Sequence, residues 1–107
     1  MRKSVWSLGI LGVALTAGLA SGKDGDAAKG KEVFEQCSVC HNSDTDDKKV
    51  GPSLKGLFKH EKLQNGKPVN DANVRAVINA GGKGMPSYQD MLSDEEKDNV
   101  IAFLKTL

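Results

Sequence analysis

The sequence predicts an all-α fold, with about three to four main helices in one small domain over residues 23–107. Three segments place apolar residues three or four positions apart, the spacing at which side chains share one face of a helix. Each of these segments begins near a residue that caps helix N-termini well. After residue 22, no segment of useful length alternates apolar and polar residues. A β-sheet protein is therefore excluded.

The first helix is expected to start at Asp26 and to run towards Cys37. Asp26 can cap it, because its carboxylate can accept hydrogen bonds from the free amides of the first turn. Gly30 lies four residues before Phe34, so both fall on the same side of this helix. Without a side chain, Gly30 would allow another helix to approach closely.

The middle of the chain predicts loops and one short helical segment. Residues 42–49 are wholly polar and indicate a surface loop. Gly51-Pro52 is a turn signal, and Leu54, Leu57 and Phe58 follow it at helical spacing. Residues 64–68 contain a further turn signal.

The second long helix is expected to be capped by Asp71 and stopped by Gly81. Its buried stripe would consist of Val74, Val77 and Ile78. The glycine-rich residues 81–86 must then form a loop.

The last helix has a clear N-terminal signal, Ser93 followed three residues later by Glu96, which is the pattern of a capping box. Its buried stripe would consist of Val100, Phe103 and Leu104.

The sequence Cys37-Ser38-Val39-Cys40-His41 carries the chemistry of the chain. Two cysteines three apart with a histidine directly after the second are the attachment signature of a c-type haem. On a helical turn, Cys37, Cys40 and His41 can all point at one porphyrin. The two thiols would add to the vinyl groups as thioethers, and the imidazole would bind the iron. Such a haem can transfer electrons, carry a gas or react with peroxide, depending on the sixth ligand and the access to it.

Other roles for the two cysteines fit less well. A zinc site needs four nitrogen or sulfur ligands, and only His60 and a few carboxylates remain as candidates. A thioredoxin-like pair needs a βαβ unit, which the pattern does not supply. A structural disulfide leaves the adjacent His41 unexplained.

The first 22 residues are expected to be a cleaved secretory signal peptide. Arg2 and Lys3 are followed by an uncharged apolar stretch from Val5 to Ala20 and then by small residues, with cleavage after Ala20 or Gly22. An uncleaved membrane anchor is the alternative, although sixteen residues are fewer than the roughly 20 that a membrane span needs. No cysteine lies near the cleavage site, which excludes a lipoprotein anchor. The mature chain is expected to be soluble and periplasmic, where bacteria complete haem attachment.

The composition limits the partners and the core. Residues 23–107 carry 13 basic and 14 acidic side chains, which gives no indication of nucleic acid binding. Only four aromatic residues remain, so we expect the porphyrin to form part of the core. The charge is uneven: residues 48–83 have eight basic and two acidic side chains, net +6. Lys55, Lys59 and Lys83 are candidates for a patch around the haem edge, although a solvated surface explains scattered lysines equally simply.

The chain resembles the class I cytochromes c over most of residues 24–107, and it is most similar to the small bacterial and photosynthetic carriers. The resemblance has three parts. The first runs from Gly25 through the attachment motif, the second is Gly51-Pro52-Ser53-Leu54-Lys55-Gly56, and the third is Met85-Pro86-Ser87-Tyr88 with the C-terminal helix. It implies first and last helices that cross at Gly30, Phe34, Val100, Phe103 and Leu104. It also implies that the Pro52 carbonyl accepts a hydrogen bond from His41, which would fix the imidazole ring.

Met85 is the expected sixth ligand, since its position matches the methionine loop of the family and a thioether raises the reduction potential. Met91 and His60 are rivals, but both lie in polar surroundings. Tyr88 either forms a hydrogen bond near the haem or simply packs. The only tryptophan, Trp6, lies in the signal segment, so no tryptophan is left to bind a haem propionate.

Three functions fit these residues. The first is a soluble one-electron carrier that docks transiently with an oxidase, a reductase or a dehydrogenase and is not itself an enzyme. The second is an electron-accepting cytochrome subunit of a periplasmic dehydrogenase. The third is a haem enzyme or gas sensor with a displaceable sixth ligand.

Overall fold

The computed structural model describes residues 25–107, and the expected signal peptide, residues 1–22, lies outside them. The elements are α1 (Ala27–Phe34), a short 3₁₀ helix η1 (Leu57–Lys59), α2 (Asp71–Ala80) and α3 (Asp94–Leu104). Residues 25–107 contain no strand, only two isolated bridges, Lys62 with Pro68 and Gly82 with Met85. The all-α prediction is confirmed.

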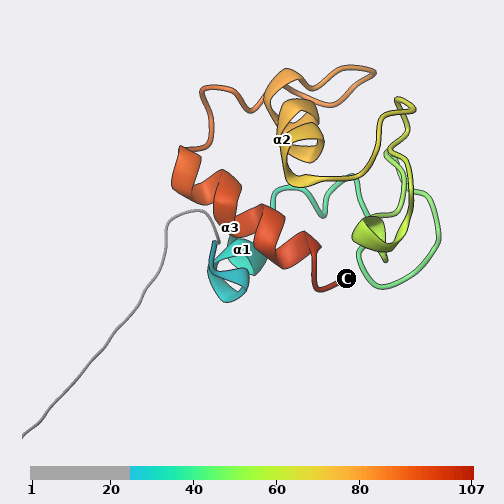
Figure 1. Cartoon of the computed structure of the whole chain (residues 1–107), viewed down its shortest axis with the longest axis horizontal. Helices are drawn as coiled ribbons and strands as arrows, with labels where there is room; N and C mark the ends of the chain where they lie inside the picture. The colour runs from blue at the N-terminus through green and yellow to red at the C-terminus, as the bar shows by residue number, and fades with distance from the viewer. Residues whose placement is uncertain (1–24) are drawn as a thin grey trace, which may run out of the picture.

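α3 packs mainly against α1 and more lightly against α2 (Figure 1). The crossing of α1 and α3 depends on Gly30, because a Cβ atom there would lie 1.9 Å from the Asn99 carbonyl oxygen of α3. Beside it, the Phe34 and Phe103 rings are 5.2 Å apart and tilted by 52°. The Asp26 amide also donates to Asn99 Oδ1 at 2.8 Å, which ties the start of α1 to α3. The expected crossing of the first and last helices is confirmed.

The core joins all three α-helices through five buried apolar side chains: Phe34, Val74, Val100, Ile101 and Leu104. The expected stripes differ from the structure in their degree of burial, although Phe103 and Ile78 do pack against this core. Ile101 is buried with Val100 and Leu104, whereas Phe103 is only partly buried, because the α3 face that meets α2 also needs an apolar contact. In α2 only Val74 is fully buried, and Val77 and Ile78 are partly exposed.

The helix ends follow the capping chemistry with two corrections. Asp26 accepts from the amides of Ala28 and Lys29 as expected, but α1 ends at Phe34, before the cysteines. Asn70, rather than Asp71, caps α2: its side chain accepts from the Asn73 amide, and Asp71 occupies the first helical position. Both residue types cap helices well, and Asn70 is the cap here because α2 starts at Asp71.

The end signals of α2 and α3 were predicted correctly. Gly81 ends α2 in a backbone conformation with φ of 66°, which glycine adopts without steric cost. Ser93 and Glu96 form the reciprocal capping box at the start of α3.

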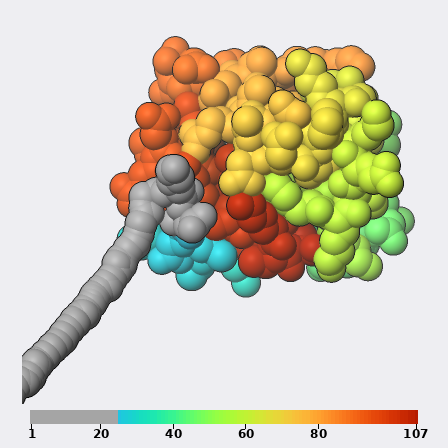
Figure 2. Space-filling model, viewed as in Figure 1, coloured from blue at the N-terminus to red at the C-terminus, as the bar shows by residue number. Residues whose placement is uncertain are grey.

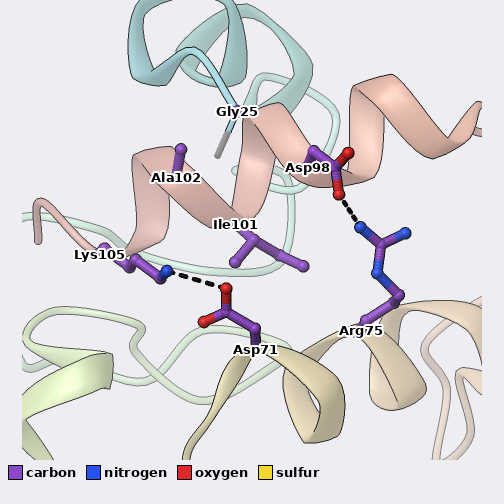
Figure 3. A pocket seen from close by; sticks show the side chains of 7 residues that line it. All are labelled: Gly25, Asp71, Arg75, Asp98, Ile101, Ala102 and Lys105. Atoms are coloured by element: carbon purple, nitrogen blue, oxygen red, sulfur yellow. Dashed lines mark hydrogen bonds and ion pairs between the residues drawn. The ribbon is translucent and has the colours of Figure 1, made fainter. Parts of the chain in front are cut away.

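Two ion pairs flank the contact between α2 and α3 (Figure 3). Arg75 binds Asp98, and Lys105 Nζ lies 2.9 Å from Asp71 Oδ2. Between them lies a shallow hollow lined by Ile101 and Ala102. The Lys105 ammonium also lies 5.6 Å from the centre of the Phe58 ring, so the segment around η1 lies beside the end of α3 (Figure 2).

Candidate functional site

The attachment motif forms a helical turn directly after α1. The Phe34 carbonyl accepts from the amides of Cys37 and Ser38, at 2.8 and 2.9 Å. The Cys37 carbonyl then accepts from the amides of Cys40 and His41, at 3.1 and 3.0 Å. These bonds hold Cys37 and His41 one helical turn apart, although the α-helix itself has ended.

The two thiols of this turn are free and partly buried. Burial, with a smaller contribution from the charge of Cys40, raises the pKa of the Cys37 thiol. Because neither cysteine forms a disulfide, both sulfurs are available for covalent attachment to a cofactor.

The His41 ring is oriented by the residues after the motif. Its Nδ1 lies 2.7 Å from the Pro52 carbonyl oxygen. A carbonyl can only accept, so Nδ1 carries a proton and donates it, which in the neutral ring leaves the lone pair on Nε2. An imidazole in this tautomer can bind a metal through Nε2, with the backbone carbonyl fixing the ring.

Gly51 forms the surface against which the His41 ring packs. A Cβ atom at Gly51 would lie 2.6 Å from Cε1 and 2.9 Å from Nδ1 of His41. The sequence indicated only a turn at this position. The structure shows that the absence of a side chain makes room for the imidazole.

The loop over residues 42–51 is fastened to the attachment turn by several hydrogen bonds. The Gly51 amide donates to the Cys40 carbonyl at 2.8 Å, and the Leu54 amide donates to the Asn42 carbonyl at the same distance. Lys49 Nζ donates to the Ser38 carbonyl at 2.9 Å. A lysine that sequence reasoning did not single out is thus bonded to the cysteine motif itself.

Met85 lies at the end of a tight loop after α2. Gly82 and Met85 exchange backbone hydrogen bonds of 2.8 and 3.1 Å, and the four residues before Met85 all have positive φ. A Cβ atom at Gly81 would lie 2.5 Å from the Met85 carbonyl oxygen, so α2 and the loop are in close contact there. Met85 is partly buried, and none of the described contacts joins it to His41.

Tyr88 follows this loop and is bonded to the end of α2. Its side chain is 8% exposed, and its amide donates to the Ile78 carbonyl at 3.0 Å. Burial first, and then the charges of Cys37 and Cys40, raise the pKa of the Tyr88 phenol.

The rival ligands lie at the surface: His60 is exposed after η1, and Met91 is 61% exposed. Within residues 25–107, no group of three or more His, Cys, Asp or Glu side chains could hold a metal ion. The same residues include no helix long and apolar enough to cross a membrane.

Comparison with known proteins gives the family. The family model described as "Cytochrome C oxidase, cbb3-type, subunit III" matches residues 25–104. Cytochrome c2 of Rhodospirillum rubrum is 31% identical over a match covering 78% of this chain and 99% of that protein. The chain belongs to the cytochrome c family.

Further relatives agree with this assignment. Cytochrome c2 of Blastochloris viridis is 43% identical over 80 residues, which cover 73% of this chain and 60% of that protein. Cytochrome cH of Methylobacterium extorquens has a TM-score of 0.59 at 28% identity, covering 78% of this chain and all of that one. Cytochrome c6 of the diatom Phaeodactylum tricornutum has a TM-score of 0.61 at 24% identity, and the match covers 77% of this chain and 93% of that one. At this identity the similarity supports the fold alone.

Membership in this family implies one covalent haem c, and Cys37 and Cys40 fit its attachment motif. The chain is an electron-carrier cytochrome. The residues around the motif fit the haem: two free thiols lie on one turn, and the imidazole has a free Nε2 and a glycine surface behind it.

Proposed function

We propose that this cytochrome carries single electrons on a haem attached through Cys37 and Cys40, with His41 and Met85 as axial ligands. The observation that carries the proposal is the hydrogen bond from His41 Nδ1 to the Pro52 carbonyl, because it leaves Nε2 free to bind iron. When bound, the haem supplies the change between Fe(III) and Fe(II).

The chain's own residues would keep the iron closed to substrates. Gly51 and the Pro52 carbonyl fix the imidazole on one side, and the loop ending at Met85 would supply a sulfur on the other. Two protein ligands leave no open position for peroxide or a gas. We therefore propose a carrier rather than a haem enzyme or a gas sensor.

Met85 is favoured as the sixth ligand by its backbone. The bridge with Gly82 gives the loop one defined shape, and Ser87 Oγ donates to the Asn79 carbonyl at 2.6 Å directly after it. Tyr88, three residues after Met85, is buried, and its amide is bonded to the Ile78 carbonyl of α2. His60 and Met91 are both exposed, so neither side chain has a buried approach to the site.

We propose that residues 1–22 direct export and are removed, so that the mature protein works in the periplasm. Covalent attachment and export are tested together by fractionating the native host and staining a denaturing gel for haem. The expected result is one haem-stained band of the shortened chain in the periplasmic fraction. Loss of the stain in the double variant Cys37→Ala, Cys40→Ala is required, and a stain that persists in this variant would refute attachment at these cysteines.

The redox partner is proposed to be acidic. The net charge of +6 over residues 48–83 motivates this, and Lys55, Lys59 and Lys83 are all exposed. Lys49 joins these candidates, since it is bonded to the attachment turn, where a haem edge would lie. A basic surface at that edge would raise the rate of association at low ionic strength.

The second candidate function is that of a subunit in a larger complex. The complex would be a periplasmic dehydrogenase, or an oxidase such as the one that the matching family model describes. Exposed apolar side chains near the attachment turn favour a contact of this kind: Val39 is 71% exposed and Val50 is 74% exposed. Size-exclusion chromatography of the periplasmic fraction separates the two functions. A carrier elutes as a protein of about 10 kDa, whereas a subunit elutes with its complex.

A further inference from the structure

Lys97 in α3 is buried, although it lies outside the haem site. Its side chain is 3% exposed, and Asn99 is the only other polar residue buried among residues 25–107. An ammonium group taken out of water is costly unless it is bonded. A buried lysine therefore needs a partner that explains its position.

The main partner is a backbone carbonyl. Lys97 Nζ donates to the Gln89 carbonyl oxygen at 3.1 Å. The Asp94 carboxylate is 3.9 Å away and 93% exposed, so water screens its charge and it contributes little. A hydrogen bond from a charged donor is stronger than a neutral one, and the Gln89 carbonyl receives such a bond.

Gln89 belongs to the segment that leads from Met85 to α3. Two hydrogen bonds join this segment to α2. Ser87 Oγ donates to the Asn79 carbonyl, and the Tyr88 amide donates to the Ile78 carbonyl. On the α3 side, Lys97 supplies the bond from within the helix. The segment is thus fastened to both helices.

We propose that Lys97 is a positioning residue, which holds the exit of the methionine loop against α3 and thereby limits how often Met85 leaves the iron. The inference rests on the proposed function, in which Met85 is the sixth ligand. An added ligand can bind ferric iron only after the loop moves away. Its apparent affinity therefore depends on the fraction of molecules in which the loop is open.

The test is Lys97→Met in the mature holoprotein, which keeps an apolar side chain of similar reach and removes the ammonium. The Gln89 carbonyl would lose its charged donor, and ferric iron should bind imidazole about tenfold more tightly. Lys97→Arg should restore most of the wild-type affinity. Should Lys97→Met fail to fold, Lys97→Gln, which keeps a neutral donor, is measured instead and should show a smaller gain in affinity.

The control is Ile101→Val, a change in the α3 face that meets α2 (Figure 3). It should lower the denaturation midpoint of the whole domain while leaving imidazole affinity unchanged. An equal gain of affinity in Ile101→Val and Lys97→Met would show that Lys97 acts only through overall stability, which would overturn the proposal.

The wild-type spectrum keeps the two proposals apart. Methionine ligation gives ferric cytochromes of this family a weak far-red absorption band. A wild-type protein without this band would contradict Met85 ligation and the role of Lys97 together. A wild-type protein with the band, whose imidazole affinity does not change in Lys97→Met, would contradict the role of Lys97 alone.

Discussion

Replacing Gly51 by alanine should disturb His41 while leaving the rest of the fold intact. The new Cβ atom would lie 2.6 Å from Cε1 of the imidazole, whereas ordinary contacts begin near 3.4 Å. The ring must therefore retreat by about 0.8 Å, or the loop must move. The loop cannot move freely, because Gly51 donates to the Cys40 carbonyl and accepts from the Lys49 amide.

The expected cost has two parts. Moving the ring weakens its hydrogen bond to the Pro52 carbonyl, worth about 1 kcal/mol, and crowding adds about 1–3 kcal/mol. Gly51→Ala should therefore lower the free energy of unfolding by about 2–4 kcal/mol. Because the ring orientation also sets the basicity of the ligand, the reduction potential should shift.

The assay is guanidinium unfolding of the oxidised holoprotein, followed by far-ultraviolet circular dichroism and by haem absorbance, together with a potentiometric titration. Gly66→Ala is the matched control. Gly66 has φ of 85° and no atom within 4 Å of a new Cβ, so alanine there costs backbone strain of about 1 kcal/mol without touching His41. If Gly51→Ala behaves like Gly66→Ala in stability and leaves the potential unchanged, Gly51 does not shape the imidazole site.

Three further predictions concern the ligand, the helix crossing and the docking surface. Met85→Ala should open the ferric iron to cyanide and lower the reduction potential, within the roughly 0.8 V range that axial ligands set. His60→Ala should change neither cyanide binding nor the potential, and the reverse result would assign the ligand to His60. Gly30→Ala should lower the free energy of unfolding by about 3 kcal/mol or more, because its Cβ would overlap the α3 backbone, and an unchanged denaturation midpoint would contradict this. Lys49→Gln should slow electron transfer with the native partner at low ionic strength, whereas Lys31→Gln in α1 should not. A wild-type electron-transfer rate that does not depend on salt would rule out electrostatic docking.

Much of the fold could be predicted because local chemistry dictates it. The Ser93–Glu96 capping box, the stop at Gly81 and the closeness of α1 and α3 at Gly30 each depend on one or two residues of unusual type. The cap of α2 was misplaced by one residue because Asn70 and Asp71 are nearly equal in capping strength.

The site could be predicted only in part. The attachment motif is contiguous, so sequence alone identifies it, and the contact of His41 with Pro52 followed from the resemblance to a family. The roles of Gly51, Lys49 and Lys97 could not be predicted, because each depends on contacts with residues 8 to 11 positions away along the chain. A glycine beside a proline indicates a turn, and nothing local shows that an imidazole packs against it.

The most direct test of the central claim is a spectroelectrochemical titration of the mature holoprotein. We predict one reversible wave with a slope of about 59 mV per tenfold change in the ratio of oxidised to reduced protein, as for one electron. The far-red band of methionine ligation should be present in the oxidised form, and the reduced form should not bind carbon monoxide. A protein that lacks the band and binds carbon monoxide readily when reduced would have an open iron site, and the assignment as a His41/Met85 electron carrier would be wrong.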